Sequence, residues 1–160
     1  MQVVSTRFGA FDVRDDTVIE FPDGLIGLDG KRFVLIAREE QLPFYWLHSA
    51  DDPGLALPVT NPWLFVPEYE VRVPDEDARR LGLDSADGAQ ILCVVRTDER
   101  PEDCSLNLAA PVVVNLHDRV GRQIINDGSG YSVRHPLFSE VELEEARAAA
   151  ETAAVAATAV

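Results

Sequence analysis

Short apolar runs separated by turns rich in glycine and proline make up most of the first 138 residues. Some runs alternate apolar and charged residues and others are short and continuous, which is typical of half-buried and buried strands respectively. A short helix is expected over residues 74–82, because Pro74 and an acidic first turn open it and Gly82 closes it. The expected strands are residues 3–13 (two pieces around Gly9), 17–21, 32–37, 44–50, 55–60, 69–73, 90–97, 104–116 (two pieces bent at Ala110-Pro111), 122–127 and 131–137.

The most informative stretch is FYWLHSADDPGLALPVTNPW, residues 44–63, which predicts a hairpin with a tight acidic turn. In that turn the Asp51 side chain can accept a hydrogen bond from the backbone two residues on. Pro53 presets φ, and Gly54 permits a positive φ. Pro58 has no N–H to donate to a sheet, so the second strand is expected at a sheet edge or a bulge.

The element pattern predicts a mainly β fold, a small antiparallel barrel-like or sandwich domain with one short helix. We expect this domain to cover residues 1–138. From Ser139 the composition changes to alanine and glutamate, so residues 139–160 are expected to form a solvated, fraying helix or a disordered tail. Ser139 and Glu142 have the spacing of a capping box, which marks a helix start.

The formal net charge of −14 limits the kinds of partner that the protein can bind. An acidic surface repels phosphate backbones, so direct nucleic-acid binding is not expected. The same charge favours a basic protein partner by steering its approach, although it can also serve solubility alone. The N-terminus lacks the pattern of a signal peptide, and no apolar run is long enough to span a membrane. A cytoplasmic location without membrane contact is therefore expected.

No motif in the chain predicts catalysis, a cofactor or a metal site. HExxH, GxSxG and phosphate-loop patterns are absent, and Cys93 and Cys104 do not have metal-binding spacing. Asp51 and Asp52 are an adjacent carboxylate pair, but neighbouring side chains in a turn diverge into water. A non-enzyme is therefore expected. A small acid-dependent hydrolase using Asp51 and Asp52 is the alternative.

A binding module agrees better with the residues. Trp63, Leu64, Phe65 and Tyr69, together with the acidic turn, are expected to form one apolar patch rimmed by acid, although each aromatic is individually a good core residue. A strand edge near Pro58 or Tyr69 offers a second mode, pairing with a partner peptide. A structural β module with no switching role is a further alternative. The partner-binding candidates are Asp51, Asp52, Asn61, Phe65, Glu68 and Tyr69.

Five blocks in order resemble the flagellar assembly factor FliW family over about residues 3–138. The resemblance implies a small, mostly β, barrel-like cytoplasmic protein that is not an enzyme. It implies two partners, flagellin and CsrA, the latter an RNA-binding protein that represses flagellin synthesis. It also implies that the two compete, so that flagellin is made only as fast as it is exported. The blocks are FPDGLIGL at 21–28, residues 44–63, LNLAAPVVVN at 106–115, RQIIND at 122–127 and YSVRHPL at 131–137.

Overall fold

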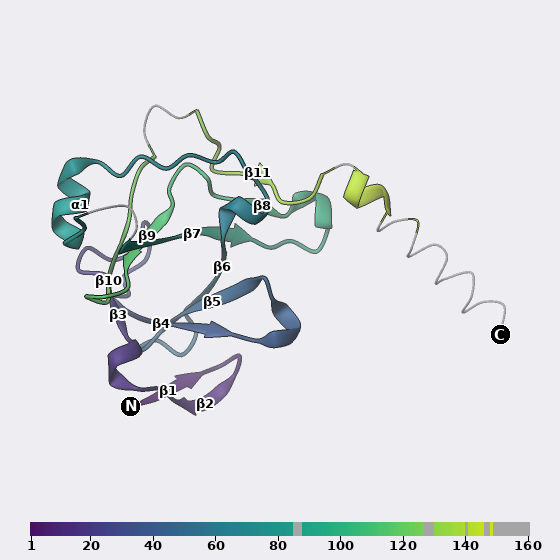
Figure 1. Cartoon of the computed structure of the whole chain (residues 1–160). Helices are drawn as coiled ribbons and strands as arrows, with labels where there is room; N and C mark the ends of the chain where they lie inside the picture. Colours follow the sequence, from purple (N-terminus) through teal and green to yellow (C-terminus); the bar gives the residue numbers. More distant parts are fainter. Residues whose placement is uncertain (85–87, 127–129, 140, 146–147, 149–160) are drawn as a thin grey trace.

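A computed structural model describes residues 1–84, 88–126, 130–139, 141–145 and 148 (Figure 1). Strands dominate this part of the chain, and they are joined by short loops and single turns of 3-10 helix. The labelled strands and helix are β1 (Gln2–Ser5), β2 (Gly9–Asp12), β3 (Ile19–Glu20), β4 (Arg32–Ala37), β5 (Phe44–Ser49), β6 (Ala56–Thr60), α1 (Asp75–Leu81), β7 (Ala89–Arg96), β8 (Ser105–Leu106), β9 (Val112–Asn115), β10 (Val120–Gln123) and β11 (His135–Pro136). Residues 141–145 are also helical, and at their start the Ser139 hydroxyl accepts the Glu142 N–H at 3.2 Å, whereas residues 140, 146–147 and 149–160 of the expected tail lie outside the described residues. The 3-10 turns are η1 (Asp15–Thr17), η2 (Glu39–Gln41), η3 (Pro62–Leu64) and η5 (Pro101–Asp103).

Seven strands close into a barrel. The sheet order runs β7-β6-β5-β4-β3-β10-β9, and β9 pairs again with β7, so the ring has no free edge between these strands. All of these pairings are antiparallel except β3 with β10, which meet in parallel at the single pair Val120 and Glu20. The predicted mainly β barrel is therefore confirmed, with one parallel seam that the sequence did not indicate. β8 and β11 extend from β7 outside the ring.

The barrel interior holds the main hydrophobic cluster. Leu47 of β5 points inward and is fully buried, while its neighbours Trp46 and His48 lie on the outer face because side chains alternate along a strand. Two smaller clusters lie outside the ring: one beneath β8 and β11, and one beneath α1. The members of the main cluster are Ile19, Phe21, Leu25, Phe33, Leu47, Val59, Leu92, Val112 and Val114.

The N-terminal hairpin β1–β2 forms its own two-stranded sheet and lies below β4 and β5 in Figure 1. Its side chains pack on the outer face of β5. The Phe8 ring meets Trp46 edge-on at 5.8 Å, and Phe11 meets the buried His48 ring at 6.2 Å. The Arg7 guanidinium lies 4.3 Å from the centre of the Trp46 ring. The hairpin therefore gives the outer face of β5 a second, aromatic layer.

The predicted helix is confirmed as α1. Gly82 has a φ of +68° and its N–H donates to the Arg79 carbonyl, while the Leu83 N–H reaches back to Ala78 at 2.9 Å. This arrangement is a glycine C-cap of the Schellman type. The buried Asn115 amide also donates to the Leu81 carbonyl at 2.7 Å, so β9 holds the end of the helix.

Four strand predictions are wrong in full or in part, among them residues 122–127, where only Arg122 and Gln123 lie in a strand, β10. Residues 69–73 form no strand, because their polar groups bond to side chains instead of a ladder. The Glu70 N–H donates to the Tyr131 hydroxyl and the Arg72 N–H to the Asn126 side chain, both at 3.1 Å. Residues 17–21 and 131–137 contain only the two-residue strands β3 and β11.

The hairpin prediction is confirmed, but the place of its second strand is not at the edge of the sheet. β6 lies between β5 and β7. Its register with β7 covers only Val59 and Thr60, so Pro58 has a sheet neighbour on the β5 side alone. Proline is tolerated there because no ladder bond to β7 is lost.

Candidate protein-binding surface

The acidic turn at the tip of β5–β6 is fixed by its own side chains. The Ser49 hydroxyl oxygen accepts hydrogen bonds from the N–H groups of Asp51 and Asp52, at 3.1 and 2.9 Å. Asp52, and not Asp51 as expected, accepts the N–H two residues on, from Gly54 at 3.0 Å. Both aspartates are exposed, as the sequence predicts.

Asp51 is held by a cation from the neighbouring strand. The Arg32 guanidinium of β4 donates to both carboxylate oxygens of Asp51, at 2.6 and 3.1 Å. This hydrogen bonding to Arg32 lowers the pKa of the Asp51 carboxyl below its ordinary value. Asp51 therefore stays ionised, which is the opposite of the raised pKa that a general acid requires.

Arg32→Gln is expected to raise the pKa of Asp51 back toward the ordinary value of about 3.9. A carboxyl titration by NMR measures this, with Arg14→Gln, which removes the exposed cation beside Asp16, as the control that leaves Asp51 unchanged. Because the folded pKa is lowered, the ion pair stabilises the fold above the unfolded pKa. That contribution is lost as pH falls through the folded pKa. An Asp51 pKa that does not move in Arg32→Gln would contradict the assignment.

The second group of candidates follows β6 at the opposite end of the hairpin. The Asn61 side-chain oxygen accepts the Trp63 N–H at 2.9 Å and so begins η3. Trp63 and Leu64 then stand at the surface, 38% and 61% exposed. Phe65 is half-buried and packs on Phe44 with ring centres 5.8 Å apart.

Tyr69 supports this surface from below. Its side chain is only 3% exposed, and its hydroxyl donates to the Leu108 carbonyl at 2.7 Å. Burial raises the pKa of the phenol, so the donor proton is retained. The backbone carbonyl of Tyr69 in turn accepts the Trp63 indole N–H at 2.8 Å. The neighbouring Glu68 is exposed.

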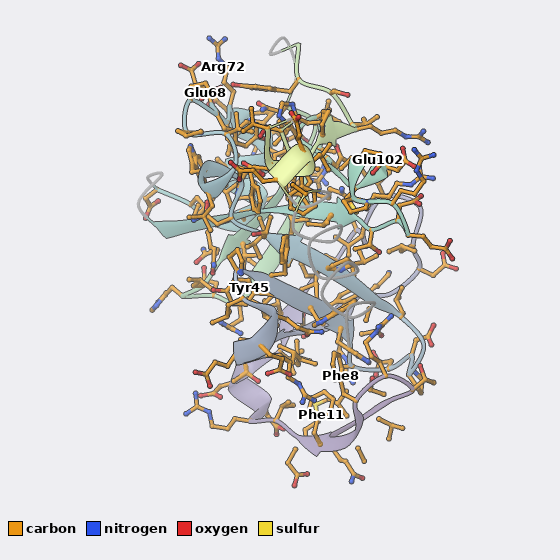
Figure 2. All side chains as sticks on the ribbon, turned by 90° about the vertical axis from the view of Figure 1, so that its right-hand side faces the viewer. Phe8, Phe11, Tyr45, Glu68, Arg72 and Glu102 are labelled. Carbon is orange, nitrogen blue, oxygen red and sulfur yellow. The ribbon has the colours of Figure 1, made fainter. Side chains whose placement is uncertain are left out.

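The expectation of one continuous patch is wrong. His48 pairs with Ala56 beside the acidic turn, whereas Phe44 pairs with Thr60 beside the η3 segment. These pairs are four residue steps apart along the strand, roughly 13 Å at the usual rise. Figure 2 shows the N-terminal hairpin, with Phe8 and Phe11, at one end of the molecule and Glu68 with Arg72 at the other. The candidates therefore form two surfaces, the acidic tip (Asp51, Asp52) and the η3 surface (Asn61, Trp63, Leu64, Phe65 and Glu68).

Two apolar grooves open on the surface, and neither was expected from the sequence. One, of about 440 Å³, lies between α1 and Trp63; the other, of about 400 Å³, lies beside Leu42 and Phe44. The alternation of apolar and charged residues at Val71 and Val73 is the one local signal of the first groove, and it is also typical of a strand. The described residues include no group of three or more side chains suited to hold a metal ion, and no helix among them is long and apolar enough to cross a membrane.

Together these observations define a small closed β-barrel protein with an acidic surface and open apolar grooves. A family model described as FliW protein matches residues 2–137. The chain therefore belongs to the FliW family of flagellar assembly factors.

Individual relatives agree with this assignment. The flagellar assembly factor FliW of Desulfitobacterium hafniense (strain Y51) is 40% identical over 146 residues, covering 91% of this chain and 96% of the relative. That of Geotalea uraniireducens is 37% identical over 145 residues, covering 91% and 89%. A crystal structure of the flagellar assembly factor FliW superposes with a TM-score of 0.82 at 28% identity, covering 88% of this chain and 99% of that one.

Proposed function

We propose that this protein is a non-enzymatic cytoplasmic binding module that takes flagellin and CsrA as alternative partners. Bound to CsrA, it relieves repression of flagellin synthesis; bound to flagellin, it is withdrawn from CsrA. Synthesis of flagellin is thereby coupled to its export. The observation that carries the proposal is membership of the FliW family over residues 2–137.

The charge of the chain supports a basic partner such as an RNA-binding protein. The net charge is −14, and the acidic tip places two carboxylates on an exposed turn. Asp51 is already paired with Arg32, but Asp52 has no ion-pair partner among the residues described. Long-range attraction of this kind speeds encounter and weakens with salt.

The local chemistry gives little support to the hydrolase alternative. Both carboxylate oxygens of Asp51 accept hydrogen bonds from Arg32, and one carboxylate oxygen of Asp52 accepts the Gly54 N–H. Hydrolysis by a carboxylate pair needs one acid with a raised pKa and one ionised base. The pKa of Asp51 is lowered instead. Docking to proteins remains the function that the surface supports best.

Calorimetry with monomeric flagellin and with CsrA from the same source tests the proposal. We expect the wild-type protein to bind each one. In stopped-flow kinetics, Asp52→Lys is expected to lower the rate of association with CsrA several-fold and to weaken the salt dependence of that rate. Asp12→Lys makes the same change of net charge on the exposed face of β2 and serves as the matched control. Absence of binding to both partners would refute the proposal, whereas equal effects of the two variants would refute only the role of the tip.

A further inference from the structure

The groove beside α1, here called the α1 groove, is an apolar surface without a described covering element. Trp63 forms one wall and Ala78 of α1 the other, and the volume between them is about 440 Å³. Val71, Val73 and Ile91 line the floor and remain only half-buried. A volume of this size lies in the range of ligand-binding pockets, roughly 300–1,000 Å³.

The walls of the α1 groove are held in place by contacts that leave their apolar faces free. The Trp63 indole N–H is already bonded to the Tyr69 carbonyl at 2.8 Å, so the ring presents no unpaired donor to the groove. Ala78 lies on a helix whose end is capped by Gly82 and tied to Asn115. The groove is therefore preformed, and a ligand would not have to order it on binding.

The rim of the α1 groove carries negative charge. Asp84 is the one charged side chain among the described residues that line it, and it is exposed with no ion-pair partner in the part of the chain described. Trp63 is 38% exposed, and Leu64 beside it is 61% exposed, so the apolar surface continues outward from the groove. An aromatic wall, an apolar floor and an acid at the edge are complementary to an apolar segment that carries a cation.

From this geometry we infer that the α1 groove binds an apolar segment of unassembled flagellin that carries a lysine or arginine beside its apolar side chains. The inference rests on the proposed function. A subunit destined for a polymer exposes, before assembly, the apolar surfaces that its permanent contacts will later bury. CsrA, as an RNA-binding protein, offers a basic and polar surface, which is complementary to the acidic tip and not to this groove.

Filling the groove tests the inference. Ala78→Leu adds an apolar side chain at the wall while keeping high helix propensity, so α1 is retained. We expect its Kd for monomeric flagellin to rise about tenfold or more, with CsrA binding unchanged. Ala10→Leu, an exposed position on β2 in the N-terminal hairpin, is the matched control and should bind flagellin normally. Circular dichroism establishes that both variants are folded.

A second pair of variants keeps the test independent of helix packing. Asp84→Lys is expected to raise the Kd for flagellin, whereas Asp52→Lys at the acidic tip leaves it unchanged. Unaltered flagellin affinity in both Ala78→Leu and Asp84→Lys would overturn the inference while leaving the proposed function intact. Sedimentation of the protein alone tests a different occupant of the groove, a second copy of this chain. Self-association of the wild-type protein that Ala78→Leu abolishes would assign the groove to that copy and would also overturn the inference.

Discussion

Phe21→Ala is expected to lower the free energy of unfolding by about 3–5 kcal/mol, the usual loss for a fully buried phenylalanine. Phe21 follows β3 and its ring packs edge-on against Phe33 of β4 at 5.4 Å. It also lies directly against Gly121 of β10. Because β3 and β10 share only one ladder pair, the contact of Phe21 with Gly121 adds side-chain packing across the parallel seam of the barrel.

Gly121 gives the complementary test of the same contact. A Cβ placed on Gly121 would lie 2.5 Å from the nearest Phe21 ring carbon, so Gly121→Ala is expected to cost about 1–3 kcal/mol by overpacking. Gly54→Ala, where a Cβ meets its nearest neighbour at an ordinary 3.6 Å, is the matched control. In urea unfolding, the double variant Phe21→Leu with Gly121→Ala should lose less free energy of unfolding than Phe21→Leu and Gly121→Ala lose in sum as single variants. Strict additivity would show that the two residues are not coupled.

Tyr69→Phe is expected to lower the free energy of unfolding by about 1–3 kcal/mol, because it leaves a buried acceptor without its donor. The phenol donates to the Leu108 carbonyl at 2.7 Å and its oxygen accepts from the Asn126 amide at 3.4 Å. Tyr45→Phe is the matched control. It removes the hydroxyl of a half-buried tyrosine of β5 (labelled in Figure 2) and should cost less than about 0.5 kcal/mol.

Tyr69→Phe also tests whether Tyr69 only stabilises the fold or contacts a partner directly. Because Tyr69 is 3% exposed, Tyr69→Phe should leave the affinity for flagellin and for CsrA unchanged at temperatures where it is folded. Calorimetry on Tyr69→Phe beside Tyr45→Phe measures this. A marked loss of affinity with little loss of stability would mean that the hydroxyl itself meets a partner.

Elements whose signals are local were predictable from the sequence. The β5–β6 hairpin has an acidic proline-glycine turn, α1 has its cap residues, and β4 is a continuous apolar run, and all three lie within a residue or two of the predicted bounds. Residues 69–73 alternate like a strand, yet Tyr131 and Asn126, more than fifty positions away, supply the partners of their backbone. No pattern within those five residues distinguishes side-chain partners from a neighbouring strand.

The candidate surface was predictable only in its parts. Turn chemistry correctly placed Asp51 and Asp52 in water, and the asparagine-proline signal correctly marked a break after β6. The predicted single patch is wrong because the strands of the β5–β6 hairpin separate the acidic tip from the η3 surface. The α1 groove was missed because its residues come from four segments, and only the closed barrel brings them together.

We propose that this protein switches between flagellin and CsrA without catalysing a reaction. Cell-free translation of flagellin messenger RNA in the presence of CsrA measures this switch. We predict that adding the protein restores flagellin synthesis, and that excess monomeric flagellin, added with it, returns synthesis to the repressed level. Synthesis that stays repressed whatever amount of the protein is added, while CsrA and the messenger are active, would contradict the account.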